Sequence, residues 1–250
     1  MRSWSLFPLL AAAGLSLAGC QGLFTTSLAS VLARKSLSVP DNLSTSQATQ
    51  LAAEAKANAD PALASALVDS LNLRIAESTN PSEREEFMAA AASAAVTASQ
   101  AGGTLMTVFQ DVTSGSAPSD SAISAVVQSI QDGATDSVVA ALSYLQDVDT
   151  ETAAAAGFGG TDYYVAAAVL AASILEDAGV DLAPTEDNQA DIRAAIQAAA
   201  TADTTGALQA QIDTALDLSQ AGAALLTAQE NPLAADLQAQ FEAFFLTPAP

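Results

Sequence analysis

The sequence predicts an all-α protein, either a helical bundle or an irregular α-solenoid of about ten helices with alanine-rich packing. Three observations predict this fold class: helix-start signals recur along the chain, apolar residues repeat every three or four positions, and strand patterns are nearly absent. Hydrophobic residues make up 50% of the 250 residues, but aromatic residues only 5%. The helices should therefore approach one another closely instead of packing around large rings.

Pairs of a capping residue and a proline mark several helix starts. Asp60-Pro61, Asn80-Pro81 and Asn231-Pro232 each place a side-chain acceptor before a proline that suits the first helical turn. Glu83 is expected to complete a capping box with Asn80. Helix ends are expected at glycines, which accept the left-handed conformation, namely at Gly102-Gly103, Gly133 and Gly179.

The segments between these marks are the expected helices, and apolar stripes support two of them. Leu63, Leu67, Leu71 and Ile75 lie four residues apart, as do Leu208, Ile212 and Leu216. The longer loops are 113–119 and 149–161, of which the first is the better boundary between two lobes. The expected helices are 26–37, 45–58, 61–78, 81–101, 104–112, 119–132, 135–148, 162–177, 186–202, 205–229 and 232–246.

The first twenty residues have the layout of an export signal. Arg2 supplies a positive charge, and Leu6 to Leu17 form an apolar stretch that is too short for a comfortable membrane span. The following segment, Leu17-Ala18-Gly19-Cys20, resembles the lipobox of bacterial lipoprotein signal peptides. The resemblance implies cleavage between Gly19 and Cys20 and acylation of the Cys20 thiol, which anchors the mature chain to a membrane.

This resemblance sets the expected organisation: a signal peptide over 1–19, a lipid anchor and tether helix over 20–43, and a helical domain over 44–250. Gln21 stands where enterobacterial lipoproteins retained at the inner membrane carry Asp, so the resemblance favours the outer membrane, facing the periplasm. The alternative is an ordinary signal peptide or an uncleaved anchor with Cys20 as a buried thiol. The stretch from Asn80 to Ala92 is similar, over one helix, to helical-repeat lipoproteins that accompany tripartite solute transporters.

The charge is strongly negative and unevenly distributed. The formal net charge is −21, and between Cys20 and Arg84 five basic residues face six acidic ones. From Glu85 onwards there are 22 acidic residues, and Arg193 is the single base. Such a field repels phosphate backbones, so a nucleic-acid partner is not expected. The expected partners are the membrane, through the lipid anchor, and an envelope protein; the acidity itself is interpreted as a solubility or salt adaptation.

The sequence lacks most of the residues that carry catalysis. It has no histidine, and its one cysteine is Cys20, so catalytic triads, thiol nucleophiles and zinc clusters are not expected. The segment Asp147 to Phe158 begins like a calcium loop but has Thr152 at the glycine position, so an EF-hand is rejected. We therefore expect no catalytic residue, no cofactor and no enzymatic activity.

Two groups of residues remain as site candidates. Five acids around one turn are candidate ligands for a hard cation, although solvated surface acids are the favoured interpretation. These are Glu176, Asp177, Asp181, Glu186 and Asp187. Four apolar residues share a face of the final helix, which is expected to dock on the core or, alternatively, to bind a partner. These are Leu237, Phe241, Phe244 and Phe245.

Three aromatic residues, Phe158, Tyr163 and Tyr164, border a glycine-rich loop, where a pocket rim and core packing are equally acceptable interpretations.

The sequence as a whole favours a non-enzymatic envelope lipoprotein that acts as a scaffold, adaptor or assembly factor. The alternative is an accessory subunit that carries a solute or lipid in an apolar cavity between helices. A hydrolase based on two carboxylates is the third hypothesis.

Overall fold

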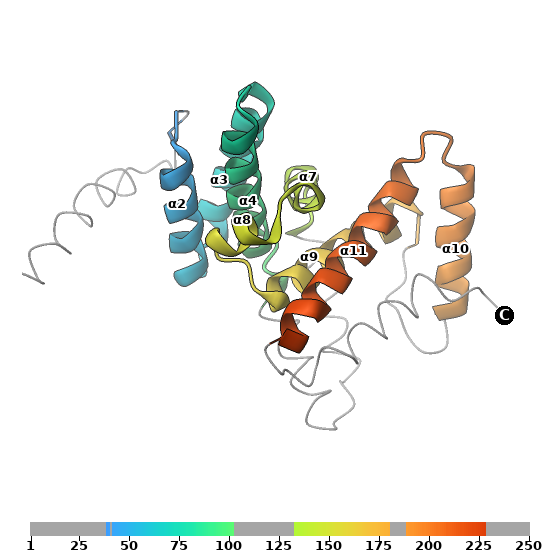
Figure 1. The fold of residues 1–250 in the computed structure, drawn as a ribbon. Coiled ribbons are helices and arrows are strands. Elements are labelled where there is room, and N and C mark those ends of the chain that lie inside the picture. The colour runs from blue at the N-terminus through green and yellow to red at the C-terminus, as the bar shows by residue number, and fades with distance from the viewer. Residues whose placement is uncertain (1–38, 41, 103–132, 181–188, 229–250) are drawn as a thin grey trace, which may run out of the picture. The chain divides into compact units, whose positions relative to one another are not determined.

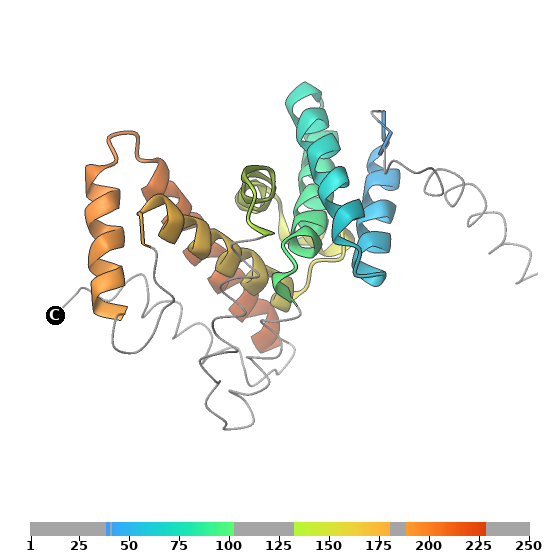
Figure 2. The same ribbon diagram turned by 180° about the vertical axis from the view of Figure 1, so that it is seen from behind.

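The computed structural model describes residues 39–40, 42–102, 133–180 and 189–228 (Figures 1 and 2), and the described residues from Pro40 onwards belong to one compact unit. These residues form helices and no strand, which confirms the predicted all-α class. The elements are α2 (Thr45–Ala57), α3 (Pro61–Glu77), α4 (Pro81–Ala98), α7 (Asp136–Ser143), the 3₁₀ helix η1 (Tyr144–Asp147), α8 (Thr150–Ala155), α9 (Gly160–Asp177), α10 (Gln189–Ala202) and α11 (Ala207–Ala228).

Helix α4 is the centre of the first group of helices. It packs against α2, α3, α7, η1 and α8, and α2, α3 and α4 lie side by side in Figures 1 and 2. From Phe87 to Val96 every residue of α4 is buried, and most of them are alanine. A helix that is apolar all round belongs in a core. The predicted alanine-rich packing is therefore found on this helix.

The leucine stripe of α3 supplies the larger side chains of the same core. Leu63, Leu67, Leu71 and Ile75 are at most 3% exposed, which confirms the predicted stripe. Each such burial contributes about 1.5–3 kcal/mol relative to exposure. Phe87, fully buried on α4, packs with its ring 5.4 Å from the Arg74 guanidinium of α3. Small side chains on α4 and large ones on α3 together fill this interface.

Helices α9 and α11 make the most extensive contact among the described helices and run side by side in both views. Leu208, Ile212 and Leu216, the stripe expected on α11, are each 7% exposed and thus buried as predicted. Gly160 and Gly222 allow the two backbones to come close, since a Cβ on Gly222 would lie 3.0 Å from the Gly160 carbonyl oxygen. Alanine at either position would press on the partner helix.

The predicted caps at Asp60 and Asn80 are confirmed, but the expected capping box is not. The Asp60 carboxylate accepts hydrogen bonds from the Ala62 and Leu63 amides, and Asn80 accepts one from the Ser82 amide. Glu83 lies in the first turn of α4 without closing a box with Asn80. A capping box is formed instead by Ser44 and Gln47 at the start of α2, because Gln47 accepts from the Ser44 amide at 3.0 Å.

Two predicted helix ends are wrong. Helix α4 ends at Ala98 instead of residue 101, because Gln100 adopts a positive φ of 54°, a conformation that interrupts an α-helix. Helix formation resumes at Ala101 and includes Gly102, so the expected stop at the glycine pair does not occur there. The expected helix 135–148 is also divided: α7 ends at Ser143, and η1 continues it in the tighter 3₁₀ form.

The prediction of a loop over 149–161 is wrong. This segment contains α8, which is capped by Asp149, and the first two residues of α9, which begins at Gly160. The Asp162 carboxylate accepts a hydrogen bond from the Gly159 amide at 2.8 Å and so fixes this earlier start. Gly179 does end α9, with a φ of 68°. Helices α10 and α11 lie within the predicted segments 186–202 and 205–229; α10 ends at the predicted residue, and α11 begins two residues later than predicted.

Several expectations concern residues outside the described ranges. They include the leader and lipobox, residues 20–38 and 41 of the tether segment 20–43, the helices 26–37, 104–112, 119–132 and 232–246, and the loop 113–119. Within the described residues, no helix is both long enough and apolar enough to cross a membrane.

Candidate functional site

The structure describes only some of the residues that the sequence singled out. Glu176 and Asp177 are exposed at the carboxyl end of α9. Among the described residues, no three acidic, histidine or cysteine side chains lie together as a metal site. The remaining candidates lie outside the described residues: Gly19, Cys20, Asp181, Glu186, Asp187, Leu237, Phe241, Phe244 and Phe245.

Of the two interpretations of the aromatic residues, core packing is correct. Phe158, Tyr163 and Tyr164 are 6%, 3% and 1% exposed, and the rings of Phe158 and Tyr163 meet edge to face at 5.3 Å. They close the start of α9 against the rest of the core. Burial raises the pKa of the Tyr163 hydroxyl, and the negative charge of Asp149 raises it further. This hydroxyl is therefore protonated at neutral pH.

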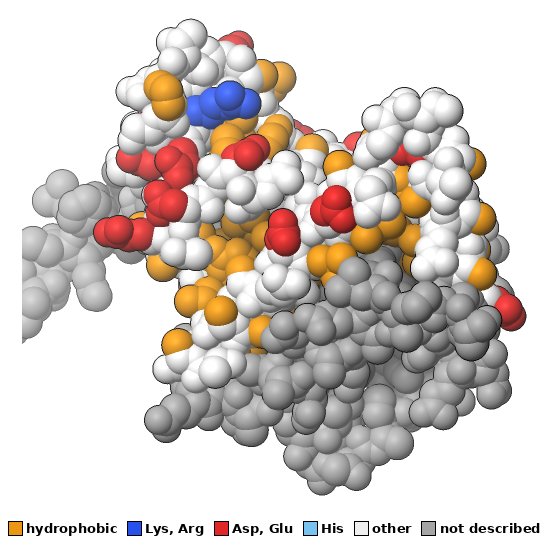
Figure 3. Space-filling model, turned by 45° about the vertical axis from the view of Figure 1, so that its right-hand side comes forward, with side chains coloured by type: hydrophobic (Ala, Val, Ile, Leu, Met, Phe, Trp, Pro, Cys, Tyr) orange, Lys and Arg blue, Asp and Glu red, His pale blue; other side chains and the backbone are white. Residues whose placement is uncertain are grey.

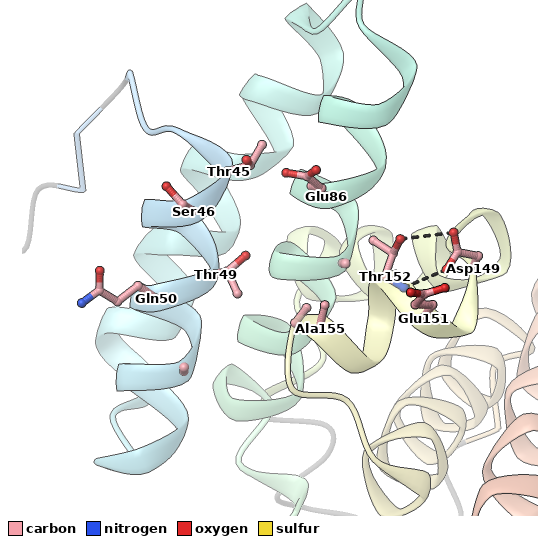
Figure 4. Close-up of a pocket in the computed structure, with 12 residues that line it drawn as sticks. Thr45, Ser46, Thr49, Gln50, Glu86, Asp149, Glu151, Thr152 and Ala155 are labelled. Carbon is pink, nitrogen blue, oxygen red and sulfur yellow. Dashed lines mark hydrogen bonds between the residues drawn. The ribbon is translucent and has the colours of Figure 1, made fainter.

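A pocket of about 610 Å³ lies on the surface between α2, α4 and α8 and is open to solvent. We call it the α2–α4–α8 groove. One wall is the polar face of α2, where Thr45, Ser46, Thr49 and Gln50 follow one another at helical spacing. Figure 4 shows Thr45 and Thr49 projecting from α2 towards the other two helices. This wall offers hydroxyl and amide groups that both donate and accept hydrogen bonds.

The opposite wall carries carboxylates. Glu86 reaches the groove from α4, and Asp149 and Glu151 reach it from the start of α8 (Figure 4). Neither Glu86 nor Glu151 has a side-chain hydrogen bond or ion pair with another described residue. Both side chains are exposed. The groove therefore presents two unpaired negative charges to solvent.

Asp149 has a structural role in the same wall. Its carboxylate accepts hydrogen bonds from the Thr152 amide at 2.7 Å and the Thr152 hydroxyl at 3.2 Å, and thereby caps α8. The hydrogen bond from the Thr152 amide is the main cause of a lowered Asp149 pKa. The Asp149 amide donates to the Glu85 carboxylate of α4 at 2.9 Å. These contacts hold α8 on α4 and keep Asp149 ionised.

The floor of the groove is made of methyl groups. Ala53 of α2, Ala89 of α4, and Ala155 and Ala156 from the end of α8 line it. Because these side chains are short, the three helices come close without filling the space between their polar side chains. The result is an apolar base between a hydroxyl wall and a carboxylate wall.

Lys56, in the last turn of α2, joins this helix to the segment after α8 and to the start of α9. Its ammonium group donates to the Asp162 carboxylate at 2.8 Å and to the carbonyl oxygen of Gly157, which follows α8, at 2.9 Å. The same oxygen of Asp162 accepts from the Gly159 amide. Lys56 is thus neutralised by α9 and does not line the groove.

The sequence does not predict this groove, although it draws attention to part of its wall. Asp149 and Glu151 stand out there only as residues of the rejected calcium loop, whereas Asp149 is the cap of a short helix. The signal is present in the sequence: an aspartate followed by Thr-Glu-Thr and an alanine run is typical of a helix start. Ser44 with Gln47 is likewise a capping-box signature that marks the start of α2.

The acidic side chains that the charge count predicts are visible at the surface. On the face shown in Figure 3 several of them gather on one side of the described region, near a patch of basic side chains.

Comparisons with the models of known protein families, with curated proteins and with solved structures find no match to this chain.

Proposed function

We propose that this chain is an exported bacterial lipoprotein, anchored through Cys20, whose helical unit is a non-enzymatic binding module that acts as a scaffold, adaptor or assembly factor in the cell envelope. The observation that carries the proposal is the lipobox Leu17-Ala18-Gly19-Cys20 directly after an apolar leader. Acyl chains on Cys20 and on the new amino terminus would hold the protein on a membrane, since each buried methylene contributes about 0.8 kcal/mol.

The capped start of α2 supports a tethered arrangement. The capping box of Ser44 and Gln47 marks where the packed helices begin, 24 residues after Cys20. A segment of this length spans at most about 80 Å when fully extended. A tethered helical unit of this kind would search the space next to the membrane for a partner while its anchor stays in place.

The packing of the helices favours a binding module over a carrier of lipids. A carrier needs apolar space between helices, and among α2, α3 and α4 that space is occupied by side chains such as Leu67, Leu71 and Phe87, all fully buried. The α2–α4–α8 groove is open and has polar walls. It suits recognition of a polar ligand or side chain at the surface.

The chemistry of the groove also favours binding over hydrolysis. Both carboxylate oxygens of Asp149 accept hydrogen bonds from Thr152, and its pKa is lowered. A general acid needs a raised pKa so that it carries a proton at neutral pH. Asp149 is therefore suited to capping α8 and not to proton donation.

Lipidation is tested by replacing Cys20 with Ser in the native organism and measuring the intact mass and membrane fraction of the product. We expect acyl additions on the wild-type chain, which should begin at Cys20, and none on Cys20→Ser. A second variant that combines Cys20→Ser with Ser30→Cys keeps the number of thiols but moves the cysteine away from the lipobox. Acylation of this control, or a soluble wild-type chain that still begins at Met1, would contradict the proposal.

The binding role is tested separately, by crosslinking the anchored protein in intact cells and purifying it under denaturing conditions. Recovery of one envelope protein in stoichiometric amount supports the adaptor. Native mass spectrometry of the uncrosslinked protein is the companion measurement, because a lipid or apolar solute in every molecule would support the carrier instead.

A further inference from the structure

Residues 149–157 contain α8 and join η1 to α9. We call this segment the α8 strap. Its buried side chains are those of Ala153 and Ala156, which are 0% and 5% exposed, while its other side chains are exposed or half-buried. Each of these two residues offers a single methyl group to the core. The strap therefore adds little buried apolar surface to the helices on which it lies.

Larger apolar side chains hold the chain in the core on both sides of the strap. Val148, directly before it, is 8% exposed, and Phe158, directly after it, is 6% exposed. The Phe158 ring also packs edge to face on Tyr163 at 5.3 Å. A segment with few buried contacts between two well-packed points is suited to local opening, in which it leaves the surface while the rest stays folded.

The hydrogen bonds that join the strap to other described helices lie at its first and last residues. The Asp149 amide donates to the Glu85 carboxylate of α4 at 2.9 Å, and the Gly157 carbonyl oxygen accepts from the Lys56 ammonium of α2 at 2.9 Å. Both bonds involve a charged side chain, and such bonds are roughly twice as strong as neutral ones. The closed position of the strap therefore depends on two side chains, one at each end.

Gly157 gives the strap a hinge at its carboxyl end. Its φ is 87°, a conformation that favours glycine, and a Cβ there would meet nothing within 4 Å. Glycine is therefore required by the backbone of the closed form and not by a close neighbour. The same residue can adopt many other conformations when the strap opens, because it has no side chain to restrict them.

Movement of the strap would change the α2–α4–α8 groove. Asp149, Glu151, Thr152 and Ala155 of the strap line it, opposite Thr45 and Thr49 of α2 (Figure 4). The groove has its carboxylate wall on α8 only while the strap lies on α4. Opening would remove that wall and leave the hydroxyl wall of α2 in place.

We propose that the α8 strap opens and closes as a unit while the other described helices stay packed, and that Glu85 and Lys56 set the balance between the two forms. The strap thereby controls when the α2–α4–α8 groove is complete. This motion goes beyond the proposed function and does not require acylation of Cys20, so its absence would leave the anchoring proposal untouched.

The test is hydrogen–deuterium exchange of the full chain, purified in a non-ionic detergent, followed by mass spectrometry of peptides that cover the strap, α4 and α11. We expect the strap amides to exchange faster than those of α4. Their rate should also respond weakly to low concentrations of urea, because local opening exposes little surface. The amides of α4 should respond more strongly, since they exchange when the whole unit unfolds.

Variants at the two ties test what controls the opening. Glu85→Ala should speed exchange of the strap about three- to tenfold, and Lys56→Met about two- to fivefold, without a comparable effect on α11. Asp69→Ala and Arg84→Met are the matched controls. They remove the same charges from exposed positions on α3 and α4 that form no ion pair with a described residue, and they should leave the strap unchanged.

A substitution at the hinge provides a separate test. Gly157→Ala forces a side chain into the left-handed conformation of the closed strap and should speed its exchange about fivefold or more. Gly179→Ala imposes the same strain after α9, where φ is 68° and a Cβ would also meet nothing within 4 Å. This control should not speed exchange of the strap.

Three results would overturn the proposal. The first is exchange of the strap at the rate and urea dependence of α4, which would show that it unfolds only with the whole unit. The second is equal acceleration of the strap and α11 by Glu85→Ala. The third is acceleration of the strap by Asp69→Ala or Gly179→Ala that equals the effect of Glu85→Ala or Gly157→Ala.

Discussion

Gly160 of α9 and Gly222 of α11 face each other so closely that a methyl group on Gly222 would lie 3.0 Å from the Gly160 carbonyl oxygen and equally close to the Tyr164 ring. The two helices make the most extensive helix–helix contact in the described structure. The absence of side chains at these two positions therefore sets the distance between α9 and α11.

Gly222→Ala should destabilise the protein for this reason. Overpacking costs about 1–3 kcal/mol, which exceeds the gain of up to about 1 kcal/mol from the better helix propensity of alanine. The measurement is urea unfolding followed by circular dichroism. Gly102→Ala is the matched control, because among the described residues its Cβ would meet the Val165 side chain alone, at 4.0 Å, an ordinary contact. Equal stability of the two variants would contradict the proposed close approach.

The alanine positions of α4 should be equally intolerant of larger side chains. Ala91 is 0% exposed, and Ala91→Leu should cost about 1–3 kcal/mol, since a close-packed interior has little room for three further carbons. Ala76→Leu makes the same change at an exposed position in the last turn of α3 and should alter the free energy of unfolding by less than about 0.5 kcal/mol. Similar thermal midpoints for the two variants would show that α4 is not in the core.

The Lys56–Asp162 pair joins α2 to α9 and should contribute modestly to stability. Lys56 is 41% exposed, so Lys56→Met should cost only about 0.5–1 kcal/mol. Asp162→Asn should cost more, because Asp162 is 16% exposed and also accepts from the Gly159 amide. A double-mutant cycle measures the coupling between the two side chains, which should decrease in about 1 M NaCl. A coupling of zero at low salt would show that the pair does not form in solution.

Asp203 should make stability depend on pH in the acid range. Hydrogen bonds, above all from the Thr205 hydroxyl and then from the Leu208 amide, lower its pKa from 3.8 to about 2. A carboxyl whose pKa is lower in the folded state stabilises that state above its unfolded pKa, and the contribution is lost as the pH falls through its folded pKa. The advantage of the wild type over Asp203→Asn should thus be full above about pH 4 and disappear towards about pH 2.

The measurement is the thermal midpoint of both proteins between about pH 6 and pH 2, with a carboxyl-carbon NMR titration of Asp203 as the direct check. Asp213→Asn, which alters an exposed acid on α11, is the control, and its difference from the wild type should not vary in the same way. A constant difference between the wild type and Asp203→Asn would contradict the lowered pKa.

Local signals were sufficient to predict most of the described fold. Helix α3 begins at Pro61 because Asp60 caps it, and its leucine stripe has the helical period, so sequence neighbours alone determine its start and its buried face. The end of α4 was not predictable in this way. Gln100 is not a residue that favours a positive φ, so no local signal marks this end; its neighbours Ser99 and Ala101 are both 0% exposed.

The groove shows the limit of sequence reasoning more clearly. Its hydroxyl wall on α2 and the cap of α8 at Asp149 are about 100 residues apart along the chain, and tertiary contacts, chiefly the packing of both helices on α4, bring them together. Helix α8 has six residues, too few for a periodic pattern to appear. The carboxylates were visible in the sequence, but their common position depends on tertiary contacts.

The buried pair Tyr163 and Tyr164 has a consequence for spectroscopy. Trp4, the one tryptophan, lies in the segment 1–19 that we propose to be a signal peptide, and the chain has three tyrosines in all. If that segment is removed as proposed, near-ultraviolet absorption and fluorescence would come almost entirely from tyrosine, and two of the three rings sit near the start of α9. An optical unfolding curve of the processed chain would then follow the environment of α9, while far-ultraviolet circular dichroism would follow all helices together.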